Sequence, residues 1–97
     1  GGGTTIISVG ENCLIGANAG IGFPLADGCT VEAGLYVTAG TKVNLLDAAG
    51  NLAKSVKAMA LSDTPDLLFR RNSLSGAVEA TPKKSSISLN DVLHSNN

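Results

Sequence analysis

Aromatic residues are scarce in this 97-residue chain, and tryptophan is absent. Aromatic side chains make up 3% of the residues, whereas hydrophobic residues as a whole make up 43%. The core should therefore be filled by Val, Ile, Leu and Ala rather than by rings, which suits a narrow interior. A chain of this length forms one small domain and buries only a modest fraction of its surface, so we expect a thin margin of stability.

Other absences exclude whole classes of function. The net charge is −1, so the chain lacks the excess of basic residues that is typical of nucleic-acid-binding proteins. No apolar run approaches the roughly 18 residues that span a bilayer. His94 is the only histidine, so a metal site made of several histidines is excluded within this chain. Two cysteines, Cys13 and Cys29, follow no secretory segment, and we expect both to be reduced and structural in a cytoplasmic protein.

Glycine recurs at every sixth position in the first half of the chain. Residues three before and one before each glycine are almost all apolar, so a second pattern has the same period. Residues two apart on a strand share a face, so each hexad supplies two inward side chains and then a glycine that can turn the chain at positive φ. The six glycines are Gly10, Gly16, Gly22, Gly28, Gly34 and Gly40.

Three such segments would make one coil of a triangular solenoid with roughly 18 residues per coil. Residues 7–48 would then form about two coils, with Val31 stacked above Cys13 in parallel register and the six glycines at equivalent corners. Asp27 interrupts the inward apolar rows beside Gly28, and we expect its carboxylate to cap backbone N–H groups at that turn. The chain starts without Met, close to the first hexad, so we expect a piece of a longer polypeptide.

The hexad pattern ends after Val43. Residues 45–61 are compatible with a helix, but the string DAAGN favours a hairpin loop. Residues 62–66 should form a turn, and residues 67–80 a strand that caps the solenoid. The predicted division is β-helix coils over 1–46, a hairpin and capping strand over 47–80, and a polar C-terminal tail over 81–97.

Few residues carry an obvious chemistry. The glycine-rich segment from Gly16 to Gly22 matches neither the dinucleotide-binding nor the P-loop spacing, and the hexads account for it. Glu32 stands on an outward row, and three basic residues lie among apolar stretches: Lys57, Arg70 and Arg71. These four side chains fit two interpretations, either solvated surface charges or groups that hold phosphates or carboxylates, for which the arginine fork is well suited.

Four strings between residues 31 and 79 are more specific than the hexads: VEAGLYVTAGT from residue 31, VKA from residue 56, LLFRRNS from residue 67 and SGAVE from residue 75. Together they resemble the end of the tetrahydrodipicolinate N-succinyltransferases of the actinobacterial type. The resemblance implies an all-β fold, a left-handed parallel β-helix with a C-terminal hairpin and strand cap. Its left-handed winding departs from the right-handed rule for parallel crossovers.

The resemblance implies an enzyme that moves succinyl from succinyl-CoA to the amine of open-chain tetrahydrodipicolinate in lysine and diaminopimelate biosynthesis. It implies a homotrimer with sites between adjacent β-helices, no permanently bound cofactor, and no nucleic-acid or membrane partner. The ligand contacts that it implies are Ala17, Glu32, Ala33, Gly40, Lys57, Arg70, Arg71, Asn72 and Ser73.

The family's catalytic glutamate and oxyanion-stabilising glycine correspond to positions before Gly1. We therefore assign no catalytic residue to this chain and expect the segment by itself to be inactive. Two alternatives remain: another hexapeptide acyltransferase, such as a serine or sugar acetyltransferase, and a non-enzymatic β-helix fragment that serves for trimerisation or capping.

Overall fold

The structure is a computed structural model that describes residues 6–83. These residues form strands connected by turns and one short 3₁₀ helix, and no helix among them is long and apolar enough to cross a membrane. The elements are β1 (Leu14–Ile15), β2 (Gly20–Gly22), β3 (Thr30–Val31), β4 (Tyr36–Thr38), β5 (Lys42–Leu46), β6 (Leu52–Lys57), η1 (Ala58–Leu61), β7 (Leu67–Arg71) and β8 (Val78–Pro82).

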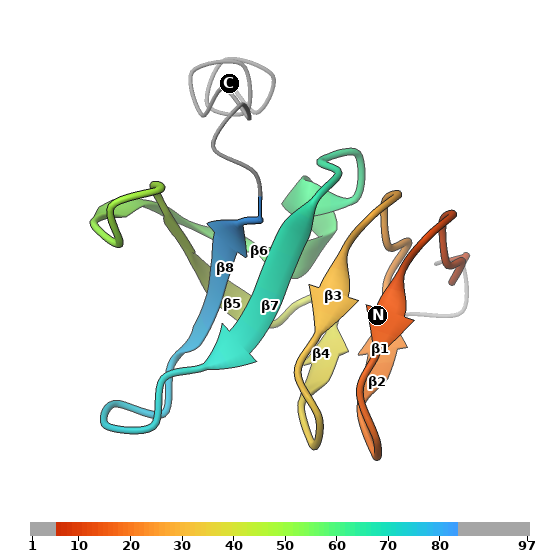
Figure 1. Cartoon of the computed structure of the whole chain (residues 1–97), viewed down its shortest axis with the longest axis horizontal. Helices are drawn as coiled ribbons and strands as arrows, with labels where there is room; N and C mark the ends of the chain where they lie inside the picture. Colours follow the sequence, from red (N-terminus) through yellow and green to blue (C-terminus); the bar gives the residue numbers. More distant parts are fainter. Residues whose placement is uncertain (1–5, 84–97) are drawn as a thin grey trace.

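Parallel coils make up the first half of the molecule. β1 pairs in parallel with β3, and β2 pairs in parallel with β4, so each coil contributes one strand to each of two faces. β3 then pairs in parallel with β7, which lies much later in the chain (Figure 1). The predicted all-β parallel β-helix is therefore confirmed, while its left-handed winding rests on the family resemblance.

Each coil is two residues shorter than predicted. Leu14 pairs with Thr30, an offset of 16 residues rather than 18, and β2 and β4 have the same offset. Val31 consequently stacks on Ile15 and not on Cys13, so the predicted register is wrong. Glycines that are six residues apart along the chain cannot all line up when the coil repeats every 16 residues.

The corners of the coils explain the shorter repeat. Gly28 and Gly34 turn the chain with φ angles of +72° and +77°, and the residues 16 positions earlier, Asn12 and Asn18, also have positive φ. Asparagine tolerates this conformation better than most residues, so it can occupy a corner that glycine occupies one coil later. Gly16 is not at such a corner, because it lies directly against the backbone of the next coil. The prediction of six equivalent glycine corners is wrong.

Asp27 has the role expected from its position beside Gly28. The backbone N–H of Glu11 donates a 2.8 Å hydrogen bond to Asp27 Oδ1, and this contact joins the corners of neighbouring coils. Asp27 is exposed rather than inside the coil, so its carboxylate remains hydrated. The predicted capping role of this carboxylate is therefore confirmed, without the burial of an unpaired charge.

The hairpin predicted around residues 47–51 is present. β5 and β6 are antiparallel, with Val43 opposite Val56, and Asp47 organises the loop between them. Asp47 Oδ1 accepts hydrogen bonds of 2.9 Å from the backbone N–H groups of both Ala49 and Asn51. A carboxylate at the start of a loop thus stabilises the turn against the alternative helix.

The segment 67–80 is not one capping strand but an antiparallel pair. β7 and β8 are joined by a turn in which Gly76 has a φ of +77°. β8 also pairs in parallel with β5, so the sheet has the order β1-β3-β7-β8-β5-β6 (Figure 1). The division into residues 1–46, 47–80 and 81–97 stays a prediction, and most of the predicted tail lies outside the described residues.

Two aromatic rings lie at the centre of the core, contrary to the expectation of a purely aliphatic interior. Phe23 and Phe69 are both fully buried, and their ring centroids are 5.7 Å apart at an interplanar angle of 69°. This edge-to-face arrangement is favourable beyond the area that the rings bury. The aliphatic side chains predicted to point inward surround this pair, among them Val31, Val37 and Val43.

The two thiols of the core differ in burial, which predicts a difference in reactivity. Cys29 is 1% exposed, and burial raises the pKa of its thiol above the ordinary value of 9.0. We expect iodoacetamide at pH 8 to modify Cys29 at least about tenfold more slowly in the folded protein than in urea, because the thiolate is the nucleophile. Peptide mass spectrometry over time measures this rate, with half-buried Cys13 as the internal comparison. Equal rates in both states would contradict the prediction.

Candidate ligand-binding site

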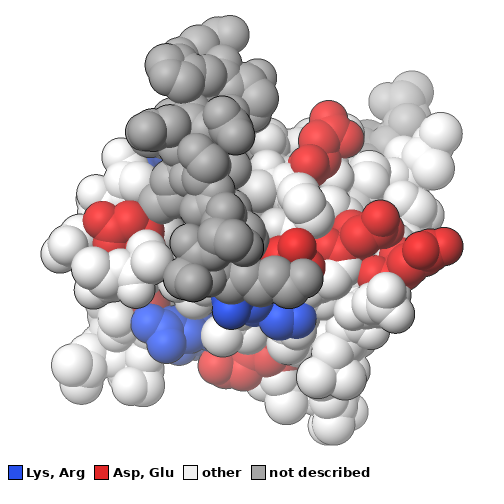
Figure 2. All heavy atoms as spheres, turned by 45° about the horizontal axis from the view of Figure 1, so that its top comes forward, with Lys and Arg blue, Asp and Glu red and all other residues white. Residues whose placement is uncertain are grey.

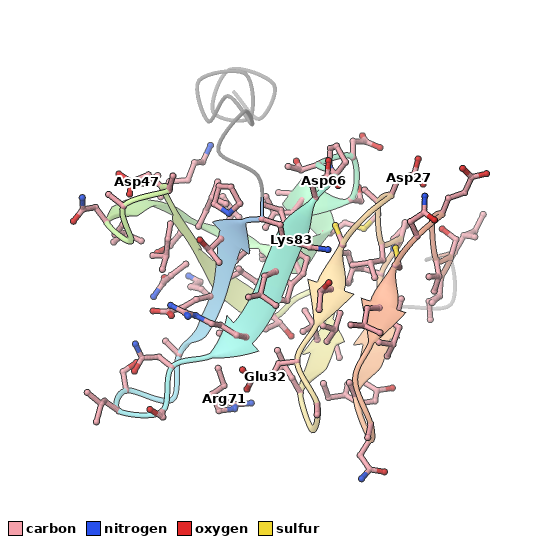
Figure 3. All side chains as sticks on the ribbon, in the orientation of Figure 1. Asp27, Glu32, Asp47, Asp66, Arg71 and Lys83 are labelled. Atoms are coloured by element: carbon pink, nitrogen blue, oxygen red, sulfur yellow. The ribbon has the colours of Figure 1, made fainter. Side chains whose placement is uncertain are left out.

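A hollow of about 420 Å³ lies at the end of β7. Five of the nine predicted ligand contacts line it, and Figure 3 shows Glu32 and Arg71 next to each other there. The residues around the hollow are Glu32, Arg70, Arg71, Asn72, Ser73, Leu74 and Glu79.

The stacking of β7 on β3 brings these residues together. Val31 pairs with Phe69, and the backbone N–H of Glu32 donates a 2.9 Å hydrogen bond to the Phe69 carbonyl. The same register places Arg70 above Glu32, although the two residues are 38 positions apart in the chain. An acidic and a basic side chain are thus neighbours on the outward face of the sheet.

Small residues lie beside the Glu32 and Arg70 pair, in the coils that come earlier in the chain. The backbone N–H of Gly34 donates a 2.8 Å hydrogen bond to the Ala17 carbonyl, which holds Ala17 beneath Ala33. Continuing the register of β3 and β7 by two residues places Arg71 above Ala33. The predicted contacts Ala17, Ala33 and Arg71 therefore form one column, and its lower part has no long side chain.

Glu79 connects two polar residues of the hollow, Arg70 and Asn72. Its Oε1 accepts a 3.3 Å hydrogen bond from Arg70 Nε, and its Oε2 accepts a 3.2 Å hydrogen bond from Asn72 Nδ2. The Glu79 side chain is 11% exposed, whereas the Arg70 side chain is 45% exposed. One end of this ion pair is therefore held inside the protein and the other faces the hollow.

The turn that borders the hollow is held by its own side chains. Asn72 Oδ1 accepts hydrogen bonds from the backbone N–H groups of Leu74 at 2.9 Å and Ser75 at 3.0 Å. Arg71 Nη1 donates a 2.7 Å hydrogen bond to the Gly76 carbonyl on the other side of the turn. The Asn72 side chain makes most of its hydrogen bonds within the protein, so its amide mainly shapes the turn.

Gly40 and Lys57 do not line the hollow. Lys57 ends β6 and stands directly opposite Lys42, the first residue of β5. Within residues 6–83 neither ammonium group has a hydrogen-bond or ion-pair partner, and like charges in this position destabilise a strand pair. Gly40 lies two residues before Lys42, at the corner that precedes β5. The predicted contacts are thus divided between two places.

The two places are at the same end of the sheet. One row of paired residues runs across the four strands from Val56 to Val43, from Val43 to Val78, and from Val78 to Arg71. The Lys57 and Lys42 pair is the next row toward that end. With strands about 4.8 Å apart, roughly 14 Å of sheet separates β6 from β7. A long ligand could reach both.

Sequence reasoning missed two residues of the hollow, Leu74 and Glu79. Glu79 had a visible signal, because it is the only charged residue between apolar positions of β8, Val78 and Ala80. Leu74 had none, because a leucine in a polar turn does not indicate a ligand site. Its side chain is 96% exposed. In the part of the chain that the structure describes, no group of three or more His, Cys, Asp or Glu residues could hold a metal ion.

Known proteins that are similar to this chain in sequence are described as N-succinyltransferases. A repeat described as the hexapeptide repeat of succinyl-transferase matches residues 6–39. A 2,3,4,5-tetrahydropyridine-2,6-dicarboxylate N-succinyltransferase from Pseudomonas putida is 66% identical over the whole chain, and one from Vibrio cholerae is 61% identical. Over its whole length, this chain is similar to part of the tetrahydrodipicolinate N-succinyltransferases. It spans 28% of the length of these two relatives.

A solved structure supports the same assignment of fold. A crystal structure described as a 2,3,4,5-tetrahydropyridine-2-carboxylate N-succinyltransferase from Campylobacter jejuni is 40% identical and matches with a TM-score of 0.72. The match covers 84% of this chain and 24% of that chain. The family resemblance seen in the sequence is thus confirmed, whereas the actinobacterial subtype stays a prediction.

Proposed function

We propose that this chain forms a ligand-binding end of an N-succinyltransferase that uses succinyl-CoA and tetrahydrodipicolinate. The observation that carries the proposal is the hollow at the end of β7, where Glu32 meets the Arg70 to Ser73 segment. In the reaction, the acceptor amine attacks the thioester carbonyl, a C–N bond forms, the C–S bond breaks, and the amine's proton leaves while CoA departs as the thiol. The catalytic base belongs to a part of the enzyme outside this chain, in keeping with the absence of a predicted catalytic residue here.

The charges around the hollow suit anionic ligands. In the view of Figure 2 most of the visible Lys and Arg side chains lie in one band, with acidic side chains close beside them. CoA carries phosphates and both substrates carry carboxylates, which are groups that a guanidinium binds through two parallel hydrogen bonds. The Lys42 and Lys57 pair provides a second cationic position for one extended ligand, with Lys42 two strands and Lys57 three strands away from Arg71.

The column of small residues suits the uncharged part of CoA. Ala17 and Ala33 leave the backbone of successive coils accessible, and Gly40 does the same at the next corner. A pantetheine arm is long, narrow and amide-bearing, so it can lie against such a strip and exchange hydrogen bonds with backbone groups. This arrangement supports the binding of succinyl-CoA, the proposed co-substrate, along the strip.

The whole protein is proposed to be a cytoplasmic homotrimer of the lysine and diaminopimelate pathway. Support within this chain comes from large apolar side chains on its outward faces, since Leu14 is 63% exposed and Tyr36 is 64% exposed. Such side chains are compatible with contacts between β-helices whose sites lie at subunit boundaries. Sedimentation of the full-length protein tests the assembly.

Arg70→Ala and Lys57→Ala, each in the full-length protein, should weaken binding of CoA or of the acceptor about ten- to hundredfold. Loss of one charge-assisted contact costs about 1.5–3 kcal/mol, whereas a solvated surface pair is worth about 0–1 kcal/mol. Isothermal titration calorimetry measures the two affinities. The melting temperature should change little in Lys57→Ala, whereas Arg70→Ala also removes a partner of the buried Glu79 carboxylate and should lower it. Lys54→Ala is the matched control, because it removes the same charge from the same strand, β6.

Two outcomes would count against the proposal. If both variants bind both ligands as the parent does, these cations are surface charges and the hollow is not a ligand site. If the full-length protein releases CoA thiol faster from acetyl-CoA than from succinyl-CoA, with a sugar or serine acceptor, the alternative acetyltransferase is correct. A full-length protein without any acyl transfer would favour the trimerisation or capping module.

A further inference from the structure

Glu79 is the only charged residue among residues 6–83 that is buried. It lies on β8 in the row formed with Arg70 of β7 and Asn44 of β5. Removal of a carboxylate from water is costly, and an apolar side chain of similar volume would serve the stability of a strand at least as well. Stability alone therefore gives no reason for a glutamate in this place.

The carboxylate is fully committed to two residues of the hollow. One oxygen accepts from Arg70 Nε and the other accepts from Asn72 Nδ2, so a single group holds two side chains at the C-terminal end of β7. Its third neighbour, Asn44, is engaged elsewhere, because Asn44 Oδ1 accepts a 2.7 Å hydrogen bond from Ser55 Oγ. The geometry of the Glu79 contacts thus relates to the hollow and not to the remainder of the sheet.

Because Glu79 binds Arg70 through Nε, the Nη atoms are the part of Arg70 that is available to a ligand. Within residues 6–83, neither Nη1 nor Nη2 of Arg70 donates a hydrogen bond, and these two atoms form the terminal edge of the guanidinium. That edge is the part that pairs with both oxygens of a carboxylate or phosphate. A long side chain that is held at Nε loses less rotamer freedom when a ligand binds.

We propose that Glu79 is a positioning residue, which orients Arg70 and Asn72 so that the terminal edge of Arg70 faces an oxyanion in the hollow. The inference rests on the proposed function, because it names the group that prepares the same site for its anionic ligand. Glu79 does not touch the ligand. It acts through Arg70, and its negative charge also pairs with the Arg70 guanidinium, which would otherwise be an unpaired cation in a partly buried position.

A double-mutant cycle in the full-length protein tests this assignment. Glu79→Gln keeps the shape of the side chain but replaces one acceptor oxygen by a donor, which cannot satisfy both Arg70 and Asn72. We expect CoA affinity to fall about five- to tenfold, and the KM for succinyl-CoA to rise more than kcat falls. We also expect Arg70→Ala to weaken binding less in the Glu79→Gln background than in the parent, because the two residues act as a unit.

The controls separate positioning from a structural role. Glu11→Gln removes the same charge from an exposed glutamate of the first coil and should leave CoA affinity unchanged. If Glu79→Gln does not fold, Glu79→Met keeps the length of the side chain without the charge, and the same cycle is measured on it. Additive effects of the Glu79 and Arg70 substitutions, or unchanged affinity in Glu79→Gln, would overturn the positioning role while Arg70→Ala still supports the site. Unchanged affinity in Arg70→Ala would overturn both.

Discussion

Phe69→Ala is expected to lower the free energy of unfolding by about 3–5 kcal/mol. Phe69 is fully buried, pairs with Val31 on one side and Ala80 on the other, and packs edge-to-face on Phe23. Its removal leaves a cavity at the point where the β-helix coils meet the β7–β8 pair. Such a loss is large beside the thin margin of stability expected of a small domain.

Urea denaturation followed by circular dichroism measures this change. Phe69→Leu keeps most of the volume and should cost less than about 1.5 kcal/mol, while Leu52→Ala truncates a side chain that is 61% exposed and should stay within about 0.5 kcal/mol. A Phe69→Ala protein that is as stable as the Leu52→Ala protein would show that β7 does not close the core as described.

Gly16→Ala is expected to destabilise the protein by about 3 kcal/mol, at the upper end of what overpacking costs. A Cβ at this position would lie 2.6 Å from the Ala33 Cα and 3.0 Å from the Glu32 carbonyl carbon. Both are backbone atoms, so no side-chain rotation relieves the contact, and the two coils would have to separate.

Gly40→Ala is the matched control, because its added Cβ meets nothing within 4 Å and its φ is not in the left-handed region. It should change the free energy of unfolding by less than about 1 kcal/mol, and a small stabilisation is the expected direction. The comparison also tests the register. In an 18-residue coil Gly16 would lie beneath Gly34 and not against the backbone of Glu32 and Ala33, so the close contact that opposes a Cβ at Gly16 would be absent. Equal stabilities of the Gly16→Ala and Gly40→Ala proteins would therefore contradict the 16-residue coil.

The candidate site was predictable in its composition and not in its geometry. The LLFRRNS string identified Arg70, Arg71, Asn72 and Ser73 as a group, because neighbours in a strand and turn stay neighbours in the fold. Glu32 joins them only through the stacking of β7 on β3, which spans 38 residues. Glu79 joins them only through the antiparallel pairing of β8. Neither pairing leaves a local pattern in the sequence.

The sequence by itself determined the parallel coils, since alternating inward side chains and regular glycines are local properties of a strand and its turn. It also determined the hairpin at residues 47–51, where Asp47 and Gly50 suit a turn and oppose a helix. Each of these features depends on residues within one strand or loop.

Only the tertiary structure decided the 16-residue coil and the site that the coil creates. Asn12 and Asn18 make corners at positive φ as Gly28 and Gly34 do, so the positions of the corners do not follow from the glycines alone. The register between coils depends on strand pairing between residues 16 and 38 positions apart. A pattern of period six cannot encode those distances, because the energy that selects them comes from pairing and packing across the whole sheet.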